Sequence, residues 1–315
     1  MNDLQVRPAR LEDTAPISLL ARAGVSAWQQ ADSTGSVHDV PYEVLTIYDR
    51  WLHGGPWMSV ETATLHLNHL LLGGGLPFVV EAAGQVVGYA ETYPGSEAAP
   101  VGDHLHLGQI LVAPEHAEAI ADALLTGVRA AAKALKLPRL TAACASGDSA
   151  SAALYARHHL GLLTSVQRMT LPARTGQGFY KVSDHPDANP MQIKGWQMPV
   201  GRIGSARQRW ELLWPLTLQA VPEIARRRVR RVQMSASGQE ALIYCEERPY
   251  DPRQAELSLW APRPLTGQLL TALRDWCHKE GYRTLGMTVA EDAVAVLGSE
   301  AESDGFRMEI YACPT

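Results

Sequence analysis

Cysteine is scarce in this sequence, and the cysteines that it has lie far apart. Because no two of them form a C-x-x-C pair, the spacing favours neither a zinc knuckle nor a redox-active pair. We expect isolated buried thiols in a reducing compartment instead. The four positions are Cys144, Cys245, Cys277 and Cys313.

Long apolar runs are also missing. The apolar stretches are of strand length or are interrupted by histidine, glycine or charge, so we expect no membrane-spanning helix. The first residues, Met1–Arg7, lack the apolar core and the cleavage site of a signal peptide. These features predict a cytoplasmic protein, and no signal in the sequence specifies an oligomeric state.

Positive charge is not in excess. The chain has 28 Lys and Arg against 33 Asp and Glu, a formal net charge of −5, which argues against a nucleic-acid binder. With 46% hydrophobic and 19% charged residues, long disorder is excluded as well. Residues 1–172 hold 10 basic and 16 acidic side chains. This acidity either favours a cationic substrate such as an amine or is ordinary surface charge.

Alternating periods of two and 3.6 predict interleaved strands and helices in the first half of the chain. Asp13, Ser59 and Asp148 are suited to cap three of the helices. The expected strands are 4–7, 78–81, 86–92, 104–112, 139–143 and 162–171. The expected helices are 13–22, 41–53, 59–72, 115–136 and 148–159.

A stretch at 173–189 is rich in Gly, Pro, Asp and Ser and lacks periodicity, which predicts a linker between domains 1–172 and 190–315. After it, strands and helices alternate again. The expected strands are 196–200, 229–235, 241–246, 256–261, 284–289 and 306–312. The expected helices are 207–221, 265–279 and 291–302.

The two halves form an internal repeat. Leu111-Val112-Ala113-Pro114 matches Leu259-Trp260-Ala261-Pro262 at an offset of 148 residues. Gly161 matches Gly305, and Asp148 matches Asp292, both at an offset of 144. We therefore predict an α/β protein of two tandem domains. Each should have a mixed, mostly antiparallel sheet with helices on both faces and a parallel fourth and fifth strand.

This order of elements resembles the GNAT acyltransferase fold. Leu4–Asp13 is similar to the family's opening strand and helix cap, and Gly88-Tyr89-Ala90 is similar to its third strand. Ile110–Glu115 resembles the fourth strand and its proline stop, and Asp148 with Leu154-Tyr155 and Gly161-Leu162 resembles the final segment. The resemblance covers residues 4–171 well and 196–312 more weakly. In outline it is that of the two-domain mycothiol synthases.

The resemblance implies an acyl-CoA-dependent acyltransferase, and in particular an N-acetyltransferase that moves an acetyl group from acetyl-CoA to a small-molecule amine. It places the pyrophosphate on backbone amides at the start of the long helix, where the helix dipole favours an anion. The implied cofactor residues are Leu111, Val112, Ala113, His116, Ala117, Glu118, Ala119, Ile120, Ala121 and Asp148.

The phosphate loop departs from the family's pattern. Ala119 stands at a glycine position, and Glu118 adds negative charge. In the second half, Arg263-Pro264-Leu265-Thr266-Gly267 retains no such motif, and Pro264 removes a donor. These departures leave an alternative open: a catalytically degenerate tandem GNAT protein that serves as a binding or assembly module.

The same resemblance identifies Tyr155 as the general acid that returns a proton to the departing thiolate. Its counterpart Ser299 is a poor acid, so we expect chemistry only in the first half. His106 on the fourth strand and Glu91 late in the third are the candidate bases. For all three, a purely structural role is the alternative.

Two further clusters have ordinary explanations. His66 and His69 lie at helical i, i+3 spacing but no third ligand is placed nearby, so we predict no metal site. The run Arg226-Arg227-Arg228 with Arg230-Arg231 either grips phosphates or ends a helix and faces solvent.

Overall fold

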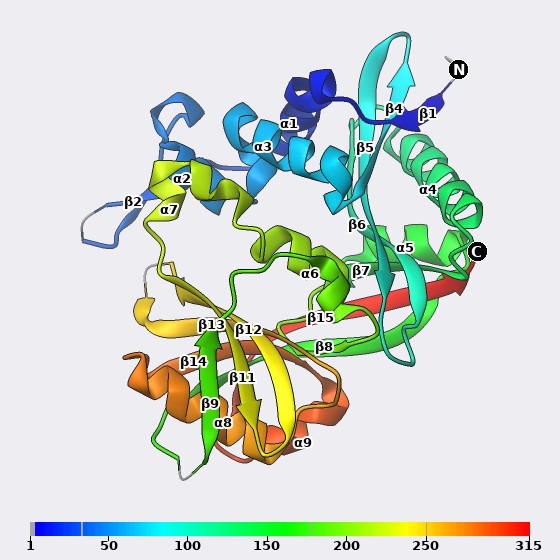
Figure 1. Cartoon of the computed structure of the whole chain (residues 1–315). Helices are drawn as coiled ribbons and strands as arrows, with labels where there is room; N and C mark the ends of the chain where they lie inside the picture. Colours follow the sequence, from blue (N-terminus) through cyan, green and yellow to red (C-terminus); the bar gives the residue numbers. More distant parts are fainter. Residues whose placement is uncertain (1–3, 33, 177, 250) are drawn as a thin grey trace. The chain divides into compact units, whose positions relative to one another are not determined.

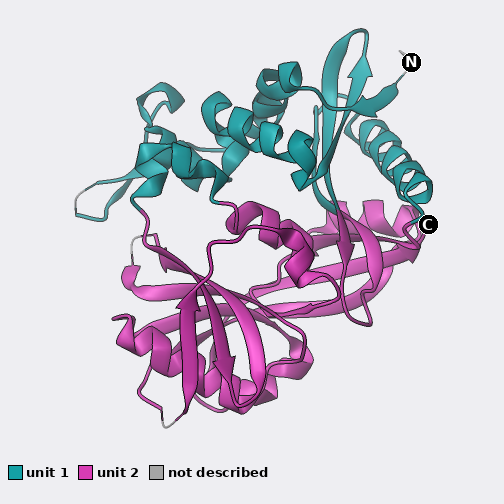
Figure 2. Ribbon diagram, in the orientation of Figure 1, with its two compact units in different colours: residues 1–93, 107–136, 216–226 teal, residues 94–106, 137–215, 227–315 magenta. Residues whose placement is uncertain are grey.

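A computed structural model of the chain describes residues 4–32, 34–176, 178–249 and 251–315. They fall into two compact units, each described by itself below (Figure 2). Unit 1 comprises residues 1–93, 107–136 and 216–226, and unit 2 the remainder. Among the described residues, no helix is both long and apolar enough to cross a membrane.

Unit 1 contains a small antiparallel sheet, in which β1 pairs with β4 and β4 with β5 (Figure 1). The strands of unit 1 are β1 (Gln5–Pro8), β2 (Gln29–Ala31), β3 (Val37–Asp39), β4 (Leu76–Ala82), most of β5 (Gln85–Ser96) and most of β6 (Asp103–Val112). Of these, β2 and β3 form a separate two-stranded sheet. The helices of unit 1 are α1 (Thr14–Ala23), α2 (Ile47–Leu52), α3 (Val60–His69), α4 (Ala117–Ala134) and α7 (Pro222–Ala225).

Side-chain caps mark the start of two helices of unit 1, α2 and α3. Ser59 caps α3 as predicted, because its hydroxyl accepts from the amide of Thr62. The helix expected over 41–53 is broken instead, since extended Thr46 caps the shorter helix α2. Asp13 precedes α1, but its carboxylate binds Arg7 at 2.8 Å and makes no cap hydrogen bond.

Unit 2 is built on one sheet whose strands follow the order β7-β15-β8-β14-β13-β12-β11-β9. The strands are β7 (Arg139–Ala145), β8 (Gly161–Pro172), β9 (Tyr180–Asp184), β10 (Gln197–Val200), β11 (Val229–Ala236), β12 (Gln239–Arg248), β13 (Asp251–Ala261), β14 (Thr284–Ala290) and β15 (Glu302–Pro314). The helices are α5 (Ser149–Arg157), α6 (Ala206–Leu213), α8 (Gly267–Lys279) and α9 (Val294–Leu297).

The two repeats exchange strands at the centre of this sheet. The last strand, β15, lies between β7 and β8, which belong to the first repeat (Figure 1). Conversely, β8 pairs with β14 of the second repeat. Each repeat therefore has one strand of the other inserted in its sheet, an arrangement that the sequence pattern does not reveal.

The opening strand of the second repeat also differs from expectation. The stretch 173–189, predicted as a linker, contains β9, which pairs with β11 as β1 pairs with β4. The expected opening strand, 196–200, is instead β10, and it pairs with β13. The helix expected over 291–302 is short, since α9 ends at Leu297 and Gly298 follows with φ 78°. The domain boundaries themselves stay a prediction.

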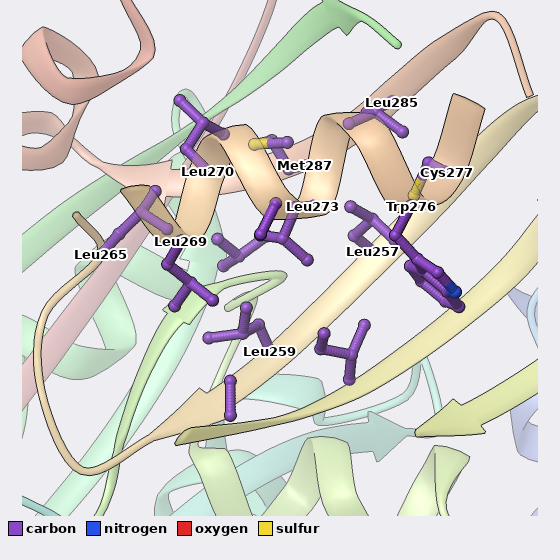
Figure 3. Close-up of a cluster of buried hydrophobic side chains, with 14 of the residues drawn as sticks. Leu257, Leu259, Leu265, Leu269, Leu270, Leu273, Trp276, Cys277, Leu285 and Met287 are labelled. Atoms are coloured by element: carbon purple, nitrogen blue, oxygen red, sulfur yellow. The ribbon is translucent and has the colours of Figure 1, made fainter. Parts of the chain in front are cut away.

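The core of unit 2 lies between α8 and the sheet, as its sequence spacing predicts (Figure 3). Thr266 caps the helix by accepting from the amide of Leu269. The parallel pairing expected for the fourth and fifth strands is present in this repeat, between β13 and β14. The buried residues of α8 that face the sheet include Leu269, Leu270, Leu273, Trp276 and Cys277.

A substitution in β15 should loosen the first repeat. Ile310 is 2% exposed, and it pairs with Ala143 of β7 and Thr164 of β8. We expect Ile310→Ala to lower the free energy of unfolding by about 2–5 kcal/mol, the usual cost of a core truncation. Amide hydrogen exchange should rise in β7 at the same time. Phe306→Ala, on the same strand but 39% exposed, is the control. Unchanged exchange in β7 would contradict the role given to β15.

Candidate functional site

The start of α4 is the part of unit 1 that suits an anion. His116 precedes the helix with φ 63°, and the amide of Ile120 makes a helical hydrogen bond to its carbonyl. The amides of the first turn, from Ala117 to Ala119, thus come before the first intrahelical bond. The dipole of this 18-residue helix adds partial positive charge there.

The predicted cofactor residues divide by burial. Leu111, Val112 and Ala113 are half-buried at the end of β6, and the amide of Ala113 already donates to Val87 at 2.8 Å. Ile120 and Ala121 are buried, and the amide of Ile120 already donates to the carbonyl of His116. At the start of α4, His116 and Glu118 are exposed, and Ala117 and Ala119 are half-buried.

Tyr155 lies on α5 against the fifth strand. Its hydroxyl donates to the carbonyl of Ala143 in β7 at 3.1 Å, and the residue is 6% exposed. Burial raises the pKa of Tyr155, because the charged phenolate is poorly solvated there. The side chain therefore keeps its proton at neutral pH, as a general acid must.

The carboxylate of Asp148 is hydrogen-bonded at the start of this helix. Its carboxylate accepts from the amide of Ser151 at 3.1 Å and from the Ser151 hydroxyl at 2.6 Å. These hydrogen bonds lower the pKa of Asp148. The residue thus caps α5 as predicted, and its cofactor role stays a prediction.

The strand exchange brings one side chain to Tyr155 that sequence reasoning missed. The ring of Tyr311, on β15, lies 5.4 Å from that of Tyr155. The Tyr311 hydroxyl donates to Glu309 at 2.5 Å, and this hydrogen bond raises the pKa of Tyr311 to about 12. The two tyrosines are 156 positions apart in the printed sequence, and only the pairing of β15 with β7 joins them.

Glu91 is enclosed in unit 1. Its Oε2 accepts from Trp57 at 3.0 Å, from His66 at 3.0 Å and from Tyr89 at 2.9 Å, and Tyr93 donates to Oε1. Burial alone would raise the pKa of Glu91, but the charge and hydrogen bond of His66 outweigh it and lower the pKa to about 2. A carboxylate held this way is a weak proton acceptor.

His106 is enclosed in unit 2. Its Nδ1 lies 3.0 Å from Thr141 Oγ1, and a Cβ placed on Gly204 would lie 2.7 Å from Nε2. Burial lowers the pKa of His106 to about 3, with a further lowering by the charges of His104 and Arg202. The ring is therefore neutral, and the backbone at Gly204 covers it.

In the second repeat the chain itself fills the space where the fourth and fifth strands separate. β13 and β14 pair only at three positions, from Gln254 with Thr284 to Glu256 with Gly286. Beyond these, β10 pairs with β13, and the amide of Gly201 donates to Thr288 of β14 at 2.8 Å.

Gly201 makes this insertion possible. Its φ is 83°, which favours glycine, and a Cβ there would lie 2.6 Å from the carbonyl of Leu257. No larger residue fits so close to β13 without moving it. The backbone of the chain therefore occupies the second repeat's interstrand space.

The other clusters are engaged within their own units. His66 is bound to Glu91, and within the described residues no group of three His, Cys, Asp or Glu is arranged to hold a metal. The arginine run forms ion pairs rather than a bare basic patch. Its pairs are Arg227–Glu246 at 2.8 Å, Arg228–Glu280 at 3.0 Å and Arg230–Asp184 at 2.9 Å.

Comparison with known proteins agrees with this architecture. Residues 41–161 match the family described as "Acetyltransferase (GNAT) family". A tandem GNAT protein from the clavulanic acid biosynthesis pathway superposes with a TM-score of 0.51 at 16% identity, covering 99% of this chain and 98% of that one. Residues 41–161 therefore match a GNAT acetyltransferase domain, and the chain as a whole shares the fold of a tandem GNAT protein.

Two further solved structures share the fold over nearly the whole of this chain. A GCN5-related N-acetyltransferase from Anabaena variabilis has a TM-score of 0.61 at 11% identity, covering 98% of this chain and 72% of that one. One from Kribbella flavida has a TM-score of 0.58 at 13% identity, covering 99% and 71%. Among curated protein sequences, none matches. The GNAT fold supports acyl transfer from acyl-CoA in general, which agrees with the prediction of an enzyme.

The buried carboxylate of Glu91 should make stability depend on pH. Since its folded pKa is about 2 and the ordinary value is 4.5, the stabilisation is present above pH 4.5 and is lost as the pH falls toward 2. We expect Glu91→Gln to cost about 1–3 kcal/mol at pH 7. In urea unfolding, this difference should shrink between pH 5 and pH 3. The control is Glu12→Gln, whose side chain is 72% exposed. A difference independent of pH would contradict the assignment.

Proposed function

We propose that this protein transfers an acetyl group from acetyl-CoA to the amine of a small molecule, and that the first repeat alone does so. The observation that carries the proposal is the match of residues 41–161, which include Tyr155, to the acetyltransferase family. Acetyl-CoA supplies the activated acyl group when bound. The chain supplies backbone amides at the start of α4 and a proton at Tyr155 Oη.

The second repeat does not fit acetyl-CoA. Its interstrand space is filled by β10, and Pro264 removes a backbone donor just before α8. We infer that this repeat has a structural task, since it supplies β15 to the sheet of the first repeat.

Neither base candidate is poised to take a proton from an ammonium group. The carboxylate of Glu91 is saturated by hydrogen bonds, and His106 is buried beneath Gly204. We infer that Glu91 and His106 hold the fold together and that the amine enters unprotonated. Turnover should then rise with pH until the amine is neutral.

A second candidate function is favoured by one observation, the first turn of α4. Ala119 carries a Cβ where phosphate would approach the backbone, and Glu118 carries negative charge. These two residues at the start of α4 are what we expect of a binding or assembly module that no longer binds acetyl-CoA. Calorimetric titration with acetyl-CoA separates the two functions.

The first-turn amides of α4 should control acetyl-CoA affinity. We expect Ala119→Gly to tighten binding about threefold to tenfold, because removing the Cβ admits a closer amide–phosphate hydrogen bond. Gly267→Ala is the matched control at the start of α8, where a Cβ would meet nothing within 4 Å. It should leave the affinity unchanged. Absence of binding at millimolar acetyl-CoA would favour the assembly module, and an effect of Gly267→Ala would move the site to the second repeat.

The hydroxyl of Tyr155 should matter for turnover. We expect Tyr155→Phe to lower kcat by roughly 10²–10⁴-fold, the usual contribution of a positioned proton donor, with acetyl-CoA affinity little changed. Steady-state kinetics with a panel of small amines measures this. Tyr311→Phe, on the neighbouring strand, is the control and should change kcat only a few-fold. An active Tyr155→Phe variant would exclude this acid.

A further inference from the structure

A cavity of about 460 Å³ lies wholly within unit 2, and none of the residues discussed as acyl-transfer candidates lines it. It is bounded by the connection from β5 to β6, the start of β8, the inserted strand β10 and the segment from the end of β14 into α9. Its size is that of a pocket for a small organic molecule.

Most of the wall is apolar. Val101, Met198 and Leu265 are buried side chains that face the cavity, and Leu163 and Val296 line it as well. Such a wall favours an apolar ligand body, because binding removes apolar surface of both partners from water.

The inner polar groups of the cavity are a buried ion pair. Glu97 is 6% exposed and Arg202 is 9% exposed, and the guanidinium of Arg202 donates to the carboxylate of Glu97. Glu97 also accepts from the amide of Ala206 at 2.8 Å, and Arg202 donates to the carbonyl of Gly204 at 3.1 Å. The two charges therefore neutralise each other, and the pair adds no net charge to the pocket.

Asp292 sets the net charge of the pocket. It is exposed and lines the cavity, and it forms no ion pair with any part of the chain that the structure describes. Because Glu97 and Arg202 compensate each other, the Asp292 carboxylate leaves the lining with one negative charge. The pocket thus combines an apolar interior with an anionic rim.

We propose that this pocket binds a small primary amine with an apolar body, its ammonium group at the carboxylate of Asp292. The hydrocarbon or aromatic part lies against Leu163, Met198 and Val296. This binding needs neither acetyl-CoA nor Tyr155, so it goes beyond the proposed acyl transfer. The second repeat would then hold a small-molecule site that β10 helps to form.

Binding is measured on the full chain without acetyl-CoA, by ligand-observed NMR and calorimetry with 2-phenylethylamine. Two probes of similar size, 2-phenylethanol and phenylacetate, keep the ring and replace the ammonium group by a neutral and by an anionic group. We expect the amine to bind at least about fivefold tighter than phenylacetate, from attraction to one partly solvated carboxylate. The expected advantage should shrink as salt is raised.

Two variants assign the binding to this pocket. Val296→Trp should abolish binding of both the amine and the alcohol by filling the cavity, and Ala293→Trp serves if that variant does not fold. Asp292→Asn should reduce the preference for the amine to less than about twofold and leave the alcohol unaffected. Glu291→Gln, the neighbouring carboxylate paired with Arg307, is the control and should change nothing.

The proposal is overturned if the amine does not bind, if the acid binds as well as the amine, or if binding survives both tryptophan variants. These outcomes are independent of the acyl-transfer proposal. Acetyl-CoA affinity and the effect of Tyr155→Phe on kcat are measured separately and should be unchanged in Asp292→Asn.

Discussion

The pairing of β15 with β7 and β8 is the interaction on which most of this structure depends. Unpaired edges at the centre of a sheet leave backbone donors and acceptors without partners, so neither repeat has a complete sheet alone. The same pairing brings the ring of Tyr311 to that of Tyr155. In this tandem protein the second repeat thus belongs to the surroundings of the first repeat's candidate acid, even though its own interstrand space is filled.

Periodicity predicted the regular elements because their burial is regular. α8 places its apolar residues at helical spacing, and Ser59 and Asp148 cap the helices expected of them. The errors occur where tertiary contacts decide. β9 has five residues between segments rich in glycine and proline, and β10 is defined by its partner β13 rather than by its own pattern. Strand exchange has no signal in the local sequence. The residue patterns of β8 and β15 would be the same whether each strand paired within its own repeat or with the other repeat.

The candidate site shows a similar limit. Residue type and spacing identified Tyr155, and the resemblance gave its role, but neither indicates how enclosed a side chain is. Glu91 and His106 are chemically suitable bases on suitable strands. Only the structure shows that four donors surround one and that the backbone of Gly204 covers the other. The sequence does not predict that Tyr311 lies beside Tyr155, because the exchange of β15 brings the two residues together.

The exchange of β15 also means that the sheet of the first repeat can be completed only late in translation. β7 and β8 emerge from the ribosome well before β15, whose first residue lies some 130 positions after the end of β8. At a translation rate of about 5–20 residues per second, β15 is synthesised roughly 6–26 seconds after β8. Until then the edges of β7 and β8 that will pair with β15 have no partner strand. During this interval the nascent first repeat has exposed strand edges, which can form hydrogen bonds with strands of other chains. Slow translation of the second repeat, or premature termination within it, should therefore favour aggregation of a first repeat whose own sequence is intact.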